Sequence, residues 1–309
     1  MSPDRSVDMT LAVYTTIYPG VEPYLSDWFG SLRKQTDREF ELWIGLDGLT
    51  SESIQQLLGT ELDATWVVAA AGATPAKIRD QALTRIAAKC SGVVLVDSDD
   101  RMHATRVEAA KASLECSELT GCALRMIDER GESLGRDFSL PAHVAPDEVF
   151  PRHNVFGFSN SAIRSEMLRQ CLPLPGDAVL VDWVLATRAW LLGARLSFDP
   201  VPRMDYRQYS ANTARLQYPI HVDQIVSDTA LVQQHFRVML NTLRPEYLRE
   251  RVRDLRNAAV EVEAFRQCIV LNPVRLKSYA EALNVQPPAT VWWSTVAYQP
   301  LEDMWKSRS

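Results

Sequence analysis

The segment Gly92-Val-Val-Leu-Val96 runs directly into Asp97-Ser98-Asp99-Asp100. Its apolar, mostly β-branched residues are typical of a strand that is buried on both faces of a parallel sheet. Three carboxylates at the carboxyl end of such a strand lie where open α/β sheets bind their ligands. These carboxylates repel one another, so the binding of a cation among them is favoured. A divalent cation that also binds a phosphorylated ligand fits best, because Mg²⁺ and Mn²⁺ prefer oxygen ligands. The alternative is a solvated acidic turn that caps the following helix.

Alternating strand and helix patterns precede this segment. Strands are expected at residues 9–16, 41–46, 64–70 and 92–96. The intervening helices are expected near residues 24–32, at 51–58 and at 75–89. Strands and helices that alternate at this spacing predict βαβ units. We therefore expect an α/β fold in which a mostly parallel, Rossmann-like sheet is flanked by helices.

The pattern is looser after Asp100. We expect helices at residues 106–118, 161–171 and 182–192, strands at 122–127 and 195–199, and a long loop at 137–154. From about residue 222 the chain changes to long helical patterns rich in arginine and glutamate. We therefore expect an α/β domain over residues 1–221 and a C-terminal helical extension over residues 222–309.

Composition excludes several classes of protein. The 309 residues are 46% hydrophobic, which is enough for a sizeable core, and the formal net charge of −6 argues against nucleic acid as the main partner. No apolar run approaches the roughly 18 residues that span a bilayer, and the N-terminus lacks the apolar segment of a signal peptide. The cysteines include no C-x-x-C pair, so neither a disulfide framework nor a zinc site is indicated. We expect a cytoplasmic protein.

Six short motifs follow one another along the first two thirds of the chain. They are Ser31-Leu32 with Gln35, Asp47-Gly48, Arg79-Asp80, Asp97-Ser98-Asp99-Asp100, Val181-Asp182 and Tyr206-Arg207. Together they resemble the motifs of the family 2 glycosyltransferases, enzymes of the GT-A fold, over roughly residues 9–215. The sequence departs from the family pattern at Asp80, where members carry Asn, and at Val181, where they carry Glu.

The resemblance implies a binding site for a nucleoside diphosphate sugar, which we expect to be UDP-linked. Its donor-binding residues would be Thr15, Thr16, Tyr18, Asp47, Arg79, Asp97, Ser98 and Arg207. By this resemblance Asp47 would accept a hydrogen bond from the base, and Arg207 would clamp the diphosphate. Local chemistry offers other roles, because Asp47 also suits the turn before Gly48 and Arg79 also suits a surface ion pair with Asp80.

The resemblance also implies a metal site and a catalytic base. Asp99 and Asp100 would bind Mn²⁺ or Mg²⁺, a Lewis acid for the leaving nucleoside diphosphate, although Asp100 equally suits a helix cap. Asp182 would take the proton of the acceptor hydroxyl, with Asp177 in reserve. A carboxylate at Asp182 would also cap the helix that follows it. The pocket for donor and acceptor would be shaped by Gly157, Ser159 and Asn160.

The C-terminal extension carries two unusual segments. Residues 244–256 contain five arginines and three acids, which predicts a salt-bridged surface helix. A homo-oligomer interface and a peripheral membrane contact are the alternatives for this helix. Trp292, Trp293 and Trp305 indicate a docking or interface patch, because such aromatic residues seldom stay exposed without a partner. Otherwise they pack back on the body of the protein.

These observations lead to one expected function and two alternatives. We expect a metal-dependent glycosyltransferase, of the hexosyltransferase type, that moves a sugar with inversion to a hydroxyl of a glycan, lipid-linked or other acceptor, as in polysaccharide biosynthesis. Val181 and Asp80 favour instead a non-catalytic nucleotide-sugar-binding or scaffold protein. A sugar nucleotidyltransferase would need a glycine-rich phosphate loop with a basic residue, which the segment Tyr18-Pro-Gly-Val-Glu-Pro23 does not supply.

Overall fold

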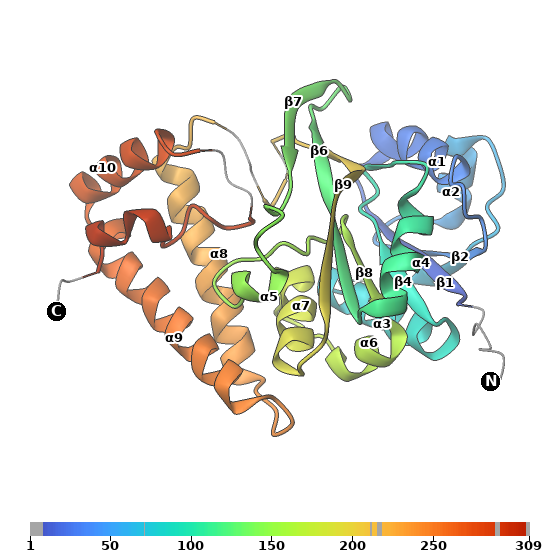
Figure 1. Cartoon of the computed structure of the whole chain (residues 1–309). Helices are drawn as coiled ribbons and strands as arrows, with labels where there is room; N and C mark the ends of the chain where they lie inside the picture. Colours follow the sequence, from blue (N-terminus) through green and yellow to red (C-terminus); the bar gives the residue numbers. More distant parts are fainter. Residues whose placement is uncertain (1–8, 71, 211, 215–217, 288–290, 307–309) are drawn as a thin grey trace.

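The computed structural model describes residues 9–70, 72–210, 212–214, 218–287 and 291–306. Within these residues a nine-stranded sheet lies between helices, and a group of long helices packs beside it (Figure 1). The strand order is β3-β2-β1-β4-β8-β6-β9-β5, and β7 pairs with β6 outside this path. The molecule is therefore an α/β structure with a helical extension.

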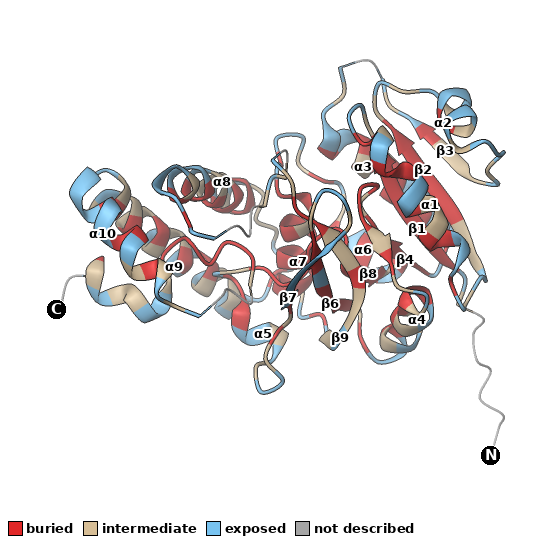
Figure 2. Ribbon diagram, turned by 90° about the horizontal axis from the view of Figure 1, so that it is seen from above, coloured by how far each residue is buried: buried red, intermediate tan, exposed pale blue. Residues whose placement is uncertain are grey.

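The first half of the sheet is parallel. Its elements are β1 (Leu11–Ile17), α1 (Leu25–Arg33), β2 (Phe40–Leu46), α2 (Ser51–Leu58), β3 (Thr65–Val68), α3 (Pro75–Lys89) and β4 (Gly92–Leu95). Leu11 of β1 pairs with Phe40 on one side and with Gly92 on the other. Every residue of β1 and β4 is buried (Figure 2), as their continuous apolar runs predict for strands covered on both faces.

The second half of the sheet is mixed. Its elements are β5 (Arg101–Met102), α4 (Arg106–Cys116), β6 (Leu119–Ile127), β7 (Ser133–Phe138), α5 (Pro146–Val149), β8 (Ser161–Arg164), α6 (Ser165–Cys171), α7 (Val181–Leu191) and β9 (Leu196–Arg207). β8 is antiparallel to both β4 and β6, whereas β9 is parallel to β6. This arrangement puts the ends of β4 and β9 on the same side of the molecule, since β5 just beyond β4 pairs with the end of β9.

The structure corrects the sequence prediction in this half. The helix expected at residues 161–171 is wrong over Ser161–Arg164, which form β8 between β4 and β6. The strand expected at 195–199 continues to Arg207, because β9 passes Pro200 and Pro202 by a shift of its register with β6. The loop expected at 137–154 begins within β7 and contains α5.

The extension packs against the sheet domain through aromatic side chains. Its helices are α8 (Val222–Asn241), α9 (Arg249–Phe265) and α10 (Pro273–Asn284), with a short π-helix at Arg266–Val270 and a 3₁₀ helix at Gln299–Met304. The His235 ring of α8 stacks on Trp183 of α7, with the ring centroids 4.0 Å apart. Trp305 packs on Phe265 within the extension, and Trp292 stacks on Phe138 of β7. These tryptophans therefore pack inward.

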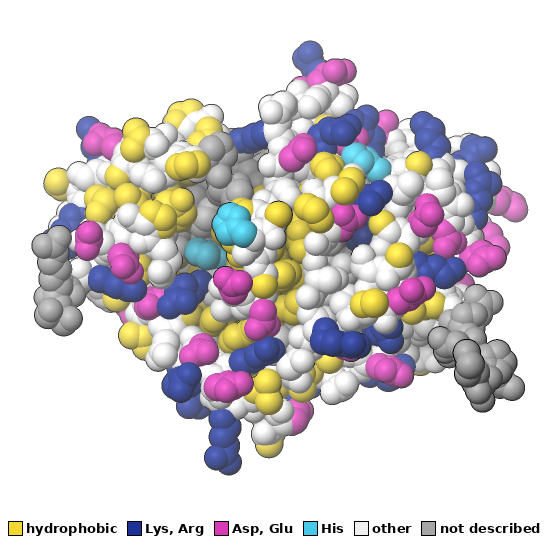
Figure 3. Space-filling model, viewed as in Figure 1, with side chains coloured by type: hydrophobic (Ala, Val, Ile, Leu, Met, Phe, Trp, Pro, Cys, Tyr) yellow, Lys and Arg dark blue, Asp and Glu magenta, His cyan; other side chains and the backbone are white. Residues whose placement is uncertain are grey.

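Charged side chains of both signs are interspersed over the extension on the face shown in Figure 3. Arg251 of α9 pairs with Asp147, and Glu261 of the same helix pairs with Arg152. These ion pairs join α9 to the segment around α5. The helix expected over residues 244–256 begins only at Arg249, and of these two ion pairs the Arg251–Asp147 pair alone lies in the expected segment. Among the described helices, none is both long enough and apolar enough to cross a membrane.

Candidate active site

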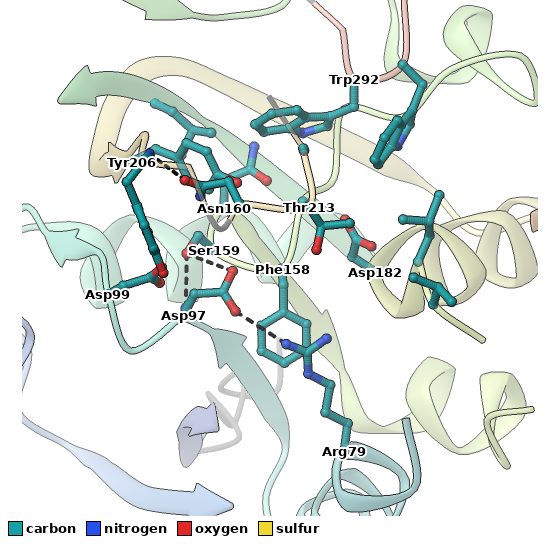
Figure 4. Close-up of a pocket in the computed structure, with 18 of the residues that line it drawn as sticks. Arg79, Asp97, Asp99, Phe158, Ser159, Asn160, Asp182, Tyr206, Thr213 and Trp292 are labelled. Carbon is teal, nitrogen blue, oxygen red and sulfur yellow. Dashed lines mark hydrogen bonds and ion pairs between the residues drawn. The ribbon is translucent and has the colours of Figure 1, made fainter. Parts of the chain in front are cut away.

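A pocket opens at the carboxyl ends of β1 and β4 (Figure 4). Segment 157–160, the first turn of α7, the residues after β9 and the loop around Trp292 complete its wall. Of the site residues expected from the sequence, those that line this pocket are Tyr18, Arg79, Asp97, Asp99, Gly157, Ser159, Asn160 and Asp182. The fold therefore brings together residues from both halves of the sheet.

Asp97 follows β4 and faces the pocket, where 28% of its side chain is exposed. Its backbone N–H donates to Ser159 Oγ at 2.9 Å, and Arg79 Nη2 lies 3.5 Å from Asp97 Oδ1. The guanidinium of Arg79 also lies over the Phe158 ring, 4.2 Å from its centroid, which fixes it beside the carboxylate. Burial raises the pKa of Asp97 to about 7, and the positive charge of Arg79 opposes this shift.

The carboxylates of Asp99 and Asp100 make different contacts. Asp99 lines the pocket, and the Tyr209 hydroxyl donates to its Oδ2 at 2.7 Å. Asp100 is 1% exposed, and its Oδ1 accepts from the Arg207 backbone N–H at 2.7 Å. Its Oδ2 accepts from the Ser159 hydroxyl. Burial raises the pKa of both carboxyl groups. Asp100 thus braces the turn, whereas Asp99 faces the pocket.

Acidic side chains outnumber basic ones among the described residues of the pocket wall. Asp97, Asp99 and Asp182 line it, and among the described lining residues Arg79 is the one cationic side chain. Within the described part of the chain, no three His, Cys, Asp or Glu side chains form a ready-made metal cage. Asp99 nevertheless fits Mg²⁺ or Mn²⁺, because one or two carboxylates hold such ions while substrate phosphates supply further ligands. The excess of carboxylates also favours a cation.

Asp182 lies in the first turn of α7 and reaches the pocket from that helix (Figure 4). Asn154 Nδ2 donates to its Oδ2 at 3.4 Å. Burial raises the pKa of Asp182 to about 6, while backbone N–H groups at the start of the helix oppose this shift. The carboxylate is therefore ionised at neutral pH but more basic than an exposed aspartate, which suits a general base. Asp177, the reserve candidate, is exposed and does not line the pocket.

Four other expected donor residues do not line the pocket. Thr15 and Thr16 are buried in β1, and Ser98 Oγ donates to the Thr16 carbonyl at 2.8 Å. Ser98 therefore ties the end of β4 to β1. Asp47 follows β2, beside the end of β1, and is partly exposed.

Arg207 does not line the pocket either. Its side chain is buried, and Nε donates to the Asp99 carbonyl at 2.8 Å. Nη1 donates to the Glu129 carbonyl at 2.8 Å, and Nη2 to Asp27 Oδ2 at 2.9 Å. The guanidinium also lies over the Tyr24 ring. A guanidinium committed to these partners is not available to clamp a diphosphate, so we reassign Arg207 from clamp to brace of the Asp99 turn.

Comparison with solved structures identifies the architecture. S. aureus TarS in complex with UDP superposes on 84% of this chain and 72% of its own, with a TM-score of 0.53 and 17% sequence identity. The mannosyltransferase PcManGT from Pyrobaculum calidifontis, in complex with GDP-Man and Mn²⁺, covers 93% of this chain and 78% of its own, with a TM-score of 0.55 and 16% identity. The chain has the GT-A fold. No protein-family model matches the sequence, and a search of curated proteins found no match.

The GT-A pocket also contains residues that sequence reasoning did not assign to the site. Tyr209 follows the expected Tyr206-Arg207 motif and holds Asp99, and Phe158 lies inside segment 157–160. Trp292 and Trp293 reach the pocket from the C-terminal extension. Their signal in the sequence was an adjacent aromatic pair, but its spacing does not say which surface the pair would cover.

Proposed function

We propose that this protein is a metal-dependent glycosyltransferase that moves a sugar from a nucleoside diphosphate, UDP in the first instance, to an acceptor hydroxyl with inversion. One observation carries the proposal: Asp97, Asp99 and Asp182 line a pocket at the carboxyl end of β4 whose one described cationic side chain is Arg79. The GT-A fold supports it, because TarS was solved with UDP-GlcNAc and PcManGT with GDP-Man and Mn²⁺.

The donor end of the pocket is formed around Asp97 and Asp99. We assign the nucleoside to the side of Tyr18 and Asp47, and the diphosphate to the space beside Arg79. Asp99, held by the Tyr209 hydroxyl, would hold Mn²⁺ or Mg²⁺ together with the diphosphate oxygens. When bound, this cation supplies positive charge that stabilises the leaving nucleoside diphosphate.

Asp182 has the properties required of the base. Asp182 lies on α7, whereas Asp97 and Asp99 follow β4. Its carboxylate can therefore approach the sugar from a different side than the diphosphate, which we assign to the end of the pocket at Asp97 and Asp99. Its Oδ2 accepts a hydrogen bond from Asn154, which orients the carboxylate. Asp182 would take the proton of the acceptor hydroxyl as that oxygen attacks the sugar, and attack on the face opposite the leaving group inverts the anomeric centre.

The two parts of the chain have different roles in this proposal. We take residues 1–221 as the catalytic GT-A domain and residues 222–309 as an extension that closes the pocket with Trp292 and Trp293.

The proposal predicts that Asp182→Asn loses turnover and keeps donor binding. The amide cannot accept the proton, so kcat for release of nucleoside diphosphate should fall by about 10²- to 10⁴-fold. The measurement is nucleotide release from UDP-glucose, UDP-GlcNAc and GDP-mannose with Mn²⁺ and a panel of glycan acceptors, with UDP and GDP affinity measured in parallel. Asp177→Asn removes the same charge outside the pocket and should keep wild-type turnover.

Three results would contradict parts of this proposal. Wild-type turnover in Asp182→Asn would mean that Asp182 is not the catalytic base. Donor binding by the wild type without transfer to any acceptor or to water would indicate a nucleotide-sugar-binding protein. Release of pyrophosphate from a nucleoside triphosphate and a sugar phosphate would indicate a nucleotidyltransferase.

A further inference from the structure

Besides Arg79 Nε, two buried polar atoms of pocket-lining residues have no hydrogen-bond partner within the described part of the chain. They are Nε1 of Trp292, a donor, and Oδ1 of Asn160, an acceptor. The Trp292 residue is 3% exposed and Asn160 is fully buried, and both line the pocket. Buried polar groups are almost always hydrogen-bonded, so this donor and this acceptor need an explanation.

Both atoms converge on Gly157, which has no side chain. A Cβ built on Gly157 would lie 3.1 Å from Trp292 Nε1 and 3.2 Å from Asn160 Oδ1. The nearest parts of the two side chains to that position are therefore one N–H donor and one oxygen acceptor. Gly157 itself lines the pocket, as do Trp292 and Asn160, whose side chains are labelled in Figure 4, so the two atoms lie at the pocket wall beside Gly157.

Other contacts hold the two side chains in these positions. Asn160 Nδ2 donates to the carbonyls of Cys122 at 2.7 Å and Val155 at 3.0 Å, so its amide nitrogen is committed and its oxygen faces Gly157. The Trp292 ring stacks on Phe138 at 4.3 Å between centroids, and the Trp292 backbone N–H donates to Asn154 at 2.8 Å. The donor and the acceptor are thus fixed before any ligand arrives.

We propose that Trp292 Nε1 and Asn160 Oδ1 hold one hydroxyl group of the donor's sugar ring above Gly157. A hydroxyl group accepts and donates at once, so it satisfies both atoms, whereas a ring carbon without oxygen satisfies neither. The inference rests on the proposed function and adds a sugar-recognising residue from the C-terminal extension. The position suits the donor sugar, because Ser159, two residues from Gly157, bonds to Asp97 at the donor end.

The test compares the affinity of a nucleotide sugar with that of its nucleoside diphosphate. Calorimetry with Mn²⁺ gives Kd for UDP, UDP-glucose, UDP-galactose, UDP-GlcNAc, GDP and GDP-mannose. We define the sugar increment as the ratio of Kd for the nucleoside diphosphate to Kd for the nucleotide sugar that binds the wild type most tightly. Trp292→Phe keeps a stacking ring and loses the N–H, so it should lower this increment about fivefold to tenfold and change UDP or GDP affinity by less than about twofold.

Two further variants make the result specific. Trp305→Phe is the matched control, because its indole is also buried with Nε1 unpartnered, in the same extension, but packs on Phe265 away from the pocket. It should keep the wild-type increment. Gly157→Ala places a methyl group against both polar atoms and should lower the increment without loss of nucleotide affinity. If Trp292→Phe does not fold, the sugar increment of Gly157→Ala tests the proposed hydroxyl site in its place.

The outcomes separate this inference from the proposed function. A wild-type increment in both Trp292→Phe and Gly157→Ala overturns the hydroxyl site, as does a wild-type protein for which no sugar adds to nucleotide affinity. Failure of UDP and GDP to bind at all overturns the proposed function, and the hydroxyl site falls with it.

Discussion

The chemistry of Asp182 depends on its position in the first turn of α7. Burial raises its pKa to about 6, and the helix N-terminus limits the rise. A base acts only in its ionised form, so activity should be lost as pH falls through this value and kept above it. We predict that kcat falls about tenfold for each pH unit below about 6.

A pH–rate profile at saturating donor checks this prediction. Asp97 also faces the pocket, with a pKa raised to about 7, so donor affinity must be measured at each pH to separate binding from proton transfer. An acid limb near pH 4, the range of an exposed aspartate, would contradict the role of Asp182.

Arg207 shows how a motif residue can act through another side chain. Because its nitrogens donate to Asp99, Glu129 and Asp27, Arg207→Lys should lower the free energy of unfolding by about 2 kcal/mol. Urea denaturation measures this loss. Arg203→Lys, at a partly exposed pair with Asp199, is the control and should lose about 0.5 kcal/mol or less. If Arg207→Lys kept wild-type stability but bound UDP or GDP more weakly, Arg207 would be a phosphate clamp after all.

At the scale of elements, the sequence predicted best what local chemistry determines. Helices at residues 51–58 and 75–89 were predicted to the residue, because capping residues and a proline at the helix start mark their ends. β8 could not be predicted in this way, since its strand character comes from pairing with β4 and β6, which are distant in sequence. The carboxylates after β4 were predictable because a buried strand ends there.

The same contrast applies to the site. Asp97 and Asp99 could be predicted from the end of a buried strand, and Asp182 from the resemblance of Val181-Asp182 to a family motif. Trp292 depends on how the extension packs on the sheet domain, which the sequence pattern does not give. The inward direction of Asp100 was also beyond the sequence, because Ser159 and the Arg207 backbone that bind it come from other elements.

The contact between α7 and α8 contains a buried histidine. His235 is 3% exposed and stacks on Trp183, and burial lowers its pKa from 6.5 to about 3. The unfolded chain therefore binds a proton below about pH 6.5 that the folded protein does not bind. Stability from this neutral imidazole is present above pH 6.5 and is lost as pH falls, by about 1.4 kcal/mol per unit.

The variant His235→Phe isolates this effect. The difference in free energy of unfolding between wild type and variant should shift with pH, with the wild type losing relative stability from pH 6.5 towards pH 4.5. Urea denaturation at several pH values measures it, and His143→Phe, at an exposed imidazole, should show no such trend. A difference independent of pH would mean that His235 is protonated within the fold.

At the scale of the whole molecule, the extension covers part of the sheet domain and supplies part of the pocket. Trp183 is fully buried beneath His235, Phe236 and Trp293, all of which belong to residues 222–306. A chain that ends at residue 221 should therefore be less stable, because uncovering Trp183 alone costs roughly 3 kcal/mol. Thermal unfolding compares it with the full chain.

A chain that ends at residue 286 is the control for this truncation. It keeps α8, α9 and α10 but lacks Trp292 and Trp293, so it should retain more stability than the shorter chain and still lose the sugar increment. Equal stability of the chain ending at residue 221 and the full chain would contradict the structural role of the extension.

The proposed function depends on a cation-assisted nucleotide site at Asp99, which calorimetric titration of the full chain with UDP and GDP can test. We expect at least one of the two nucleotides to bind saturably, with one site per chain. This binding should require Mn²⁺ or Mg²⁺ and should be weakened at least tenfold by Asp99→Asn. Absence of binding to both nucleotides, or binding that needs no cation and is unchanged in Asp99→Asn, would contradict it.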